Sequence, residues 1–354
     1  MVSSVADAVP LSDDQLDIED ALALHRYLIQ EGIISPSDHF ASAALPGGVS
    51  NRTVLVNLNG RDRLVIKQAL ARLRVSTEWL SDRSRIHTEA CGLRWLSGII
   101  PGRVPEFFFE DEPNFLLGMS AVEDCSGTWK SEIFAGRIEA SRFTDAAEIL
   151  SAIHVAGTDS LEARTQFSDK RFFDSLRLEP YYRFTAGRVT GAAEFLNVLQ
   201  AECAGISCTV THGDFSPKNL LVTRRGLVLI DHEVIHIGDP AFDVGFVLAH
   251  FLSKVHRLPE LRPQLLNAVN QFASAYLRSL SRMPWAAEVE NRSVRHALGC
   301  LLARAAGRSQ VEYLAPEQKE RQIAVVLSLI NNPPCSIPQL ADQFERLLNA
   351  DGNY

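Results

Sequence analysis

The chain lacks a membrane-spanning run and an excess of basic residues. No stretch approaches the roughly 18 consecutive apolar residues that a membrane span needs, and the first twenty residues contain neither the basic nor the apolar region of a secretory leader. Acidic residues outnumber basic ones, 43 against 35, which argues against nucleic acid as the main partner, because duplex binding usually needs a basic face. We expect a cytoplasmic protein that binds neither membrane nor nucleic acid, and the sequence leaves its oligomeric state open.

Cysteines are few and scattered, six in 354 residues. A chain of this length can bury a core without disulfides, so reduced thiols are expected. Cys203, Cys208 and His212 could supply three zinc ligands, but the stretch from Cys208 to His212 alternates like a strand and offers no evident fourth ligand. Strand packing is the favoured interpretation of these residues.

Three common catalytic patterns are also missing. The sequence has no G-x-S-x-G elbow, no H-E-x-x-H pair and no dinucleotide fingerprint, so hydrolases, zinc proteases and NAD enzymes lack their minimum residues. The composition, with 46% hydrophobic and 22% charged residues, is that of an ordinary globular protein. Its length allows two domains or lobes.

The N-terminal third mixes one helix with β-rich segments. A capping box at residues 12–15 predicts a helix that ends near Glu31, and residues 35–48 are expected to form a loop. Residues 49–70 predict two strands joined through Asn59-Gly60, with Lys67 at the end of the second strand. From Ser84 the spacing turns helical and places Glu89 on or beside the apolar face, where a carboxylate needs a partner.

A second hairpin is expected at residues 104–122, and helices dominate the rest, from two helices at 129–157 to long runs at 262–281 and from 292 onward. One short β island interrupts these helices. Its sequence, THGDFSPKNLLVTRRGLVLIDHE, predicts a strand at 220–223, a turn at 224–226 and a strand at 227–230.

Equal strand lengths in this hairpin would bring Asn219 next to Asp231, with their Cα atoms about 5 Å apart. An amide oxygen and a carboxylate at one end of a hairpin predict a site for Mg²⁺, which takes oxygen ligands. Glu233 points the same way as Asp231 and adds a second carboxylate. Asp214 can face this site without being a ligand, and can accept the proton of an attacking hydroxyl.

These motifs resemble a known family. HGDFSPKN is similar to the H-R-D-x-x-x-x-N catalytic loop, with Gly213 in place of arginine, and IDHE stands where D-F-G would be. Together with GGVSN and VIKQAL, they resemble the aminoglycoside phosphotransferase / choline kinase superfamily over residues 45–315, most closely its methylthioribose kinase side. The resemblance implies an α+β, protein-kinase-like fold: a helical appendage at 1–44, a β-rich N-lobe at 45–122 and a mainly helical C-lobe at 123–354.

The resemblance also assigns roles to residues. It implies that Asp214 orients and deprotonates an acceptor hydroxyl, and that Asn219 and Asp231 hold Mg²⁺ with the help of Glu233. ATP is expected between the lobes, with Lys67 on its phosphates and Glu89 holding that lysine. The remaining nucleotide-binding candidates are Gly47, Gly48, Ser50 and Asn51 in a loop over the phosphates, and Ala121 and Val122 in a hinge whose backbone binds adenine.

Two further residues are expected to support the loop rather than the chemistry. His212 would hold it, and Asp243 would brace it while also serving as the N-cap of an apolar helix.

Two alternatives stay open for the substrate. Arg304 and Arg308, four apart on one helix face, bind an anionic or polyhydroxyl substrate or else are solvated or pair with Glu312.

Tyr181 belongs to a packing cluster or lines the substrate site.

The predicted reaction is transfer of the γ-phosphoryl group of ATP to a hydroxyl of a small molecule. A nucleotide-binding regulator without turnover is the alternative from another class. A protein kinase is disfavoured, because only a short segment separates Asp231 from the next helix.

Overall fold

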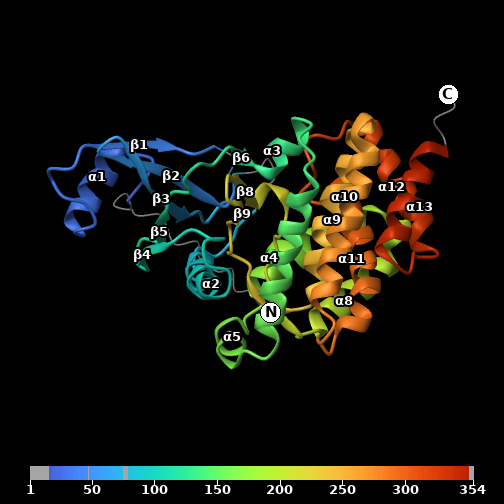
Figure 1. The fold of residues 1–354 in the computed structure, drawn as a ribbon. Helices are drawn as coiled ribbons and strands as arrows, with labels where there is room; N and C mark the ends of the chain where they lie inside the picture. Colours follow the sequence, from blue (N-terminus) through green and yellow to red (C-terminus); the bar gives the residue numbers. More distant parts are fainter. Residues whose placement is uncertain (1–15, 47, 75–78, 351–354) are drawn as a thin grey trace, which may run out of the picture. The chain divides into compact units, whose positions relative to one another are not determined.

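The computed structural model describes residues 16–46, 48–74 and 79–350 (Figure 1). The chain divides into two compact units. The first, called the β-rich unit, comprises residues 1–87 and 108–121, and the second, called the helical unit, comprises residues 88–107 and 122–354. The predicted capping box at 12–15 lies outside the described residues.

The β-rich unit is built on a five-stranded sheet with the order β1-β2-β3-β5-β4. Its first three strands form an antiparallel meander, and β5 pairs with β3. Both predicted hairpins are present. The strands are β1 (Phe40–Ala44), β2 (Asn51–Leu58), β3 (Arg61–Ala69), β4 (Phe107–Asp111) and β5 (Leu116–Ser120).

The turn between β2 and β3 confirms the sequence prediction. Asn59 and Gly60 both have positive φ, 54° and 79°, and Leu58 pairs with Arg61. Lys67 was expected at the strand end, but β3 continues for two residues beyond it. The loop predicted at 35–48 was wrong in part, because residues 40–44 form edge strand β1; its sequence, FASAA, is rich in alanine and carries little β propensity.

Helix α1 (Ala21–Gln30) shares the core of this sheet. Asp20 caps it by accepting a hydrogen bond of 2.9 Å from the backbone N–H of Leu22. On its inner face, Leu24 and Leu28 are fully buried in one cluster with Val54 of the sheet. The helix is thus held by apolar burial, which contributes about 1.5–3 kcal/mol for each large side chain.

Helix α2 (Arg85–Ile99) begins where the spacing predicted it. Ile86, Ala90 and Leu93 on the predicted stripe are fully buried, and Glu89 is buried beside them. The helix starts in the β-rich unit and continues into the helical unit.

The helical unit packs its longest helices side by side, with α9 against α11 and α10, and α10 against α4 (Figure 1). The predicted helices after Trp129 and in the last hundred residues are confirmed. Among the described residues, no helix combines the length and apolar content that crossing a membrane requires. The α-helices are α3 (Trp129–Phe134), α4 (Ala140–Thr158), α5 (Leu161–Gln166), α6 (Arg171–Phe173), α7 (Phe184–Arg188), α8 (Ala193–Gly205), α9 (Pro240–Arg257), α10 (Arg262–Ser279), α11 (Ala286–Ala306), α12 (Pro316–Ile330) and α13 (Ile337–Ala350).

The β island lies within the helical unit. It contains the hairpin β8 (Leu220–Thr223) and β9 (Gly226–Leu229), extended by β6 (Gly127–Thr128), and a separate pair of β7 (Thr209–Thr211) with β10 (His236–Gly238). Shorter helical turns are η1 (Asp174–Arg183, a π-helix), η2 (Thr190–Ala192), η3 (Pro217–Asn219) and η4 (Pro259–Leu261).

The register of the hairpin differs by one residue from the prediction. Thr223 pairs with Gly226, so the turn has two residues rather than three. Asn219 consequently lies opposite Ile230, whose N–H donates to the Asn219 carbonyl at 2.9 Å, and not opposite Asp231. The prediction erred because the chain reverses between Arg224 and Arg225, and Gly226, with φ of 128°, already belongs to the second strand.

Candidate active site

Asp214 is a buried carboxylate held by three side chains. Its Oδ1 lies 3.0 Å from Arg177 Nη2, and its Oδ2 lies 3.0 Å from Lys218 Nζ and accepts a hydrogen bond of 2.7 Å from Asn219 Nδ2. Burial opposes the charged form, but Arg177 and Lys218 outweigh it and hold the pKa of Asp214 below its ordinary value. Asp214 is therefore an ionised, fixed hydrogen-bond acceptor at neutral pH.

The backbone that carries Asp214 is braced from α9. Asp243 accepts hydrogen bonds from the N–H of His212 (2.6 Å) and of Gly213 (2.7 Å), and His154 Nε2 lies 3.2 Å from it. Gly213 needs its left-handed φ of 77°, and a Cβ there would lie 2.9 Å from Val234. The hydrogen bonds to Asp243 and the close contact with Val234 thus both fix the conformation of this loop.

His212 is fully buried and holds the same loop. Its Nδ1 accepts the N–H of Asp214 at 3.2 Å, and its Nε2 lies 3.1 Å from His232 Nδ1. Burial lowers the pKa of His212, which favours the neutral ring. These contacts are those of a positioning residue.

The N-cap predicted for Asp243 was wrong. Helix α9 starts at Pro240, and its N-cap is Asp239, which accepts the N–H of Ala241 at 3.0 Å. Proline at the first helical position fixes this start. Asp243 lies one turn inside the helix, where its side chain accepts hydrogen bonds from the loop that carries Asp214.

Three carboxylates converge next to this loop. One oxygen each from Glu89, Asp231 and Glu233 lies within 4.8 Å of the others, and both glutamates are buried. In the part of the chain that the structure describes, this is the only group of three or more histidine, cysteine or acidic side chains arranged to hold a metal. The zinc alternative at Cys203, Cys208 and His212 is not formed.

Asp231, a member of this cluster, has an unusual backbone conformation. Its φ is 71°, in the left-handed region that few residues other than glycine occupy. Such a conformation persists only when its surroundings impose it, and it is common at functional sites. Asn219, by contrast, directs its amide nitrogen to Asp214, with a second hydrogen bond of 3.0 Å to the Asp214 carbonyl.

Gly92 allows Glu89 to approach the other two carboxylates. It lies one turn after Glu89 on α2, and a Cβ built on it would be 3.0 Å from His232 Cβ and 3.0 Å from Ile235 Cγ2. Any larger residue at this position would require the segment after β9 to shift by a few tenths of an ångström.

The nucleotide-binding candidates of the β-rich unit occupy the interior strands β2 and β3 and the loop before β2. Lys67, Ser50 and Asn51 are buried, whereas Gly47 lies outside the described residues. Gly48 is described but has an ordinary φ. Arg85 fixes the loop by donating to the carbonyl oxygens of Ser50 and, at 2.9 Å, of Leu70.

The two hinge candidates follow β5. Ala121 donates its N–H to the carbonyl of Arg63 at 3.1 Å, which extends the pairing with β3 by one residue. Val122 is the first residue of the second segment of the helical unit.

The substrate candidates are placed differently from the prediction. Helix α11 ends at Ala306 and is followed by the extended Gly307, so Arg304 and Arg308 do not share a helix face. Neither pairs with Glu312, which instead contacts Lys130. Arg308 Nη2 lies 3.5 Å from Glu179, and the Arg304 guanidinium lies over Tyr181, 5.5 Å from the ring centroid.

Two residues of the site were missed from the sequence. Lys218 stands inside the motif HGDFSPKN, four residues after Asp214, and its spacing could have revealed it. Arg177 also donates to the carbonyl of Gly213 at 2.8 Å, but it lies on η1, and nothing in its local sequence points to the loop.

Comparison with known proteins identifies the family of this arrangement. A model described as "Phosphotransferase enzyme family" matches residues 43–280. Methylthioribose kinase 2 of Oryza sativa subsp. japonica is 26% identical over 236 residues, which cover 57% of this chain and 55% of the relative. The chain thus spans about half the length of the curated relatives it matches.

Solved structures agree at the level of the fold. An ethanolamine kinase of Plasmodium vivax gives a TM-score of 0.55 at 9% identity, with 92% of this chain and 87% of that chain covered. The ADP-bound aminoglycoside phosphotransferase APH(2'')-Ib gives 0.51 at 13% identity, with 92% and 99% covered. The predicted fold class, a β-rich part and a mainly helical part of protein-kinase-like type, is confirmed.

Proposed function

This chain belongs to the phosphotransferase enzyme family, and on that premise we propose that it transfers the γ-phosphoryl group of ATP to a hydroxyl of a small molecule. The observation that carries the proposal is Asp214, a buried carboxylate that Arg177, Lys218 and Asn219 hold in one orientation. A carboxylate so fixed can accept a hydrogen bond from an acceptor hydroxyl and take its proton during transfer.

A lowered pKa makes Asp214 a weak base but a dependable acceptor. This fits a loose phosphoryl-transfer transition state, in which positioning contributes more than proton abstraction does. Lys218 and Arg177 keep the carboxylate ionised before the acceptor arrives. Asp243 supports the reaction indirectly, because it fixes the backbone N–H groups of His212 and Gly213.

The carboxylate cluster fits Mg²⁺. Glu89 and Glu233 are buried and Asp231 is half-buried, and the oxygens of the three converge; carboxylate oxygens are the hard ligands that Mg²⁺ prefers. We assign Asp231 and Glu233 as the residues that hold the ion, with Glu89 beside them and with the Asn219 side-chain oxygen as a further donor. Bound Mg²⁺ would neutralise charge on the phosphates of ATP.

On the β-rich unit, we assign Lys67 to the nucleotide phosphates and the loop residues Gly48, Ser50 and Asn51 to their backbone contacts. Ala121 and Val122 are assigned to adenine. Gly47 belongs to the same proposed loop. These assignments rest on the family motifs and on the burial of Lys67, Ser50 and Asn51.

The acceptor is a small molecule rather than a protein. Residues 232–239 are all that separate Asp231 from α9, and every one of them is buried, so they leave no exposed segment of the kind that binds a peptide. The methylthioribose kinase relatives favour an acceptor of the sugar type.

A turnover assay with matched acceptors tests the proposal. ADP formation from ATP would be followed with sugars, thiosugars, amino alcohols and aminoglycosides, each with and without Mg²⁺, while nucleotide binding is measured separately. We expect acceptor-dependent ADP formation that requires Mg²⁺. Nucleotide binding without turnover on any acceptor would instead indicate a regulator, and absence of nucleotide binding would contradict both.

A further inference from the structure

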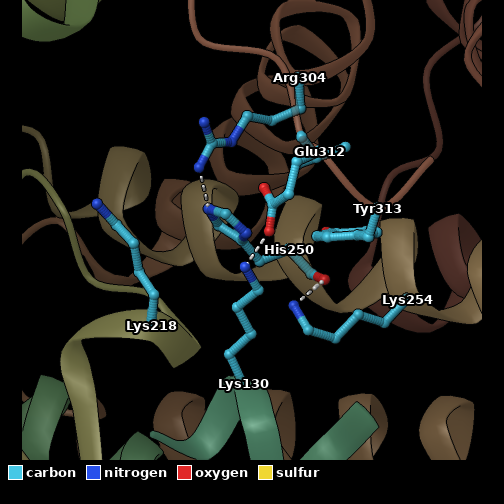
Figure 2. Close-up of a pocket in the computed structure, with 8 residues that line it drawn as sticks. Lys130, Lys218, His250, Lys254, Arg304, Glu312 and Tyr313 are labelled. Atoms are coloured by element: carbon cyan, nitrogen blue, oxygen red, sulfur yellow. Dashed lines mark hydrogen bonds and ion pairs between the residues drawn. The ribbon is translucent and has the colours of Figure 1, made fainter. Parts of the chain in front are cut away.

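A small pocket of the helical unit gathers cations from four elements (Figure 2). Its cavity volume is about 50 Å³. Lys130 comes from α3, Lys218 from η3, Lys254 from α9 and Arg304 from α11. Such a concentration of one sign is unusual in a chain with a net charge of -8.

Only part of this charge is balanced within the protein. Lys130 contacts Glu312, and Lys218 lies 3.0 Å from Asp214. Among the described residues, neither Lys254 nor Arg304 has a carboxylate within 4.0 Å, although Glu312 is near enough to interact with both electrostatically. Buried charges normally have such a partner, because an isolated one is costly to desolvate.

Lys254 is the clearest case. Its side chain is 1% exposed, and its ammonium donates to the backbone carbonyl of His250 at 3.0 Å, one turn earlier on α9. The rings of Phe134 and Tyr313 lie 5.8 and 5.4 Å away. Burial, then Lys130 and Arg304, lower the pKa of Lys254 from 10.5 to about 7.

Arg304 lies on the other side of His250 and is likewise buried. Its Nη2 is 3.0 Å from His250 Nε2, which must accept this hydrogen bond because a guanidinium only donates. His250 is therefore neutral and adds no charge. Arg304 Nη1 donates to Ser309, and Arg304 Nε has no hydrogen-bond partner in the described part of the chain.

The pocket is connected to the proposed base through one side chain. Lys218 lines the pocket and also lies 3.0 Å from Asp214 Oδ2. A group bound among Lys130, Lys254 and Arg304 would thus be placed next to the carboxylate that faces the acceptor hydroxyl.

We propose that this pocket binds an anionic group of the acceptor, a carboxylate or a phosphate, and so selects hydroxyl compounds that carry a negative charge. The inference rests on the proposed phosphotransferase function and names its substrate class. Oxyanions match the donors present, since ammonium and guanidinium groups bind both carboxylate and phosphate. The pocket presents four cationic side chains and one carboxylate, Glu312. It would therefore repel an acceptor that carries an amine.

Binding of simple oxyanions tests the pocket separately from turnover. Inorganic phosphate and acetate would be titrated by calorimetry into the full chain and into Lys254→Met. We expect saturable binding of one or both anions, weakened at least tenfold in Lys254→Met. Which anion binds more tightly distinguishes a phosphate-bearing from a carboxylate-bearing acceptor.

Lys254→Met is expected to fold, because methionine suits the apolar surroundings of Phe134 and Tyr313 and removes a buried charge. The matched control is Lys170→Met, since Lys170 also donates to carbonyls, those of Ala204 and Ile206, but does not line the pocket. Anion binding should be unchanged in the control. Absent binding, or equal binding in Lys254→Met and wild type, would overturn the proposal.

Turnover with one neutral, two anionic and one cationic six-carbon acceptor adds the substrate readout. Glucose, gluconate, glucose 6-phosphate and glucosamine share a hydroxylated six-carbon chain. We expect kcat/KM about tenfold or more higher for an anionic member than for glucose, and lowest for glucosamine. Highest activity with glucosamine would overturn the proposal that the acceptor is anionic, but would still support phosphotransferase activity. Inactivity on every acceptor would contradict the proposed function. The calorimetry would then test anion binding by the pocket on its own.

Discussion

Glu89 on α2 and Asp231 after β9 bring carboxylate oxygens within 4.8 Å of each other, although 142 positions separate them in the sequence. Two carboxylates at that distance repel each other, and a cation bound between them would offset this repulsion. The close packing of Gly92 on His232 makes this approach feasible. We therefore expect the packing at Gly92 to affect the affinity of this carboxylate cluster for a metal.

Gly92→Ala should weaken the metal site. The added Cβ would meet His232 and Ile235 at 3.0 Å and push α2 outward, which moves Glu89 away from Asp231 and Glu233. We expect the Mg²⁺ concentration for half-maximal turnover to rise several-fold and the free energy of unfolding to fall by about 1–3 kcal/mol. Urea denaturation and Mg²⁺ titration measure the two effects.

Gly98→Ala on the same helix is the matched control. A Cβ there meets nothing within 4 Å, so the substitution should stabilise α2 by about 0.5–1 kcal/mol through helix propensity alone. Its Mg²⁺ requirement should equal that of wild type. If Gly92→Ala behaves like Gly98→Ala, the packing argument is wrong.

Asp243→Asn should disturb the catalytic loop. Asp243 uses both oxygens to accept from His212 and Gly213, and an amide offers one oxygen only. One buried N–H then faces an NH₂ group, which costs about 1–3 kcal/mol. Chemical denaturation should show this loss together with slower turnover, while the exposed Asp342→Asn on α13 stays within about 0.5 kcal/mol of wild type. Full stability in Asp243→Asn would contradict the bracing role.

Anion binding should depend on pH through Lys254. Its pKa of about 7 lies below the ordinary 10.5, so the ammonium is charged below about pH 7 and loses its proton above it. The other charged groups that face it are Lys130, Arg304 and Glu312. Two neutral groups also face it, His250, whose pKa burial holds well below 6.5, and Tyr313, whose pKa burial raises.

Sulfate, whose charge is constant in this range, should therefore bind more weakly as the pH rises from about 6 to about 9. Because arginine stays charged, Lys254→Arg should bind sulfate with a flatter pH profile. Calorimetry at several pH values gives both profiles. Parallel profiles in the two proteins would exclude Lys254 as the titrating group.

Local sequence patterns predicted much of the fold. Asn59-Gly60 predicted its hairpin because asparagine and glycine themselves favour the positive φ that the turn requires at both positions. Strand β1 escaped prediction because its alanines pair only through the neighbour β2. The register of the β8–β9 hairpin was missed by one residue, since the sequence does not show whether Gly226 closes the turn or opens the strand.

The candidate site likewise contains residues whose proximity the sequence predicts and residues that only tertiary packing brings together. Asp214, Asn219 and Lys218 lie in one short motif, so their proximity follows from the chain itself. Arg177 and Lys254 reach the site from η1 and α9, and only tertiary packing brings them there. The Arg304–Arg308 pairing failed because Gly307 ends α11 between them, a C-cap that the apolar spacing did not reveal.

The central claim is that Asp214 accepts the proton of the acceptor hydroxyl, and single-turnover phosphoryl transfer with Asp214→Asn tests it most directly. With ATP bound to saturation in both proteins, we expect the transfer rate to fall about 10²–10⁴-fold in the variant, with nucleotide affinity unchanged. A rate within about threefold of wild type, with acceptor and nucleotide bound equally well, would contradict the account.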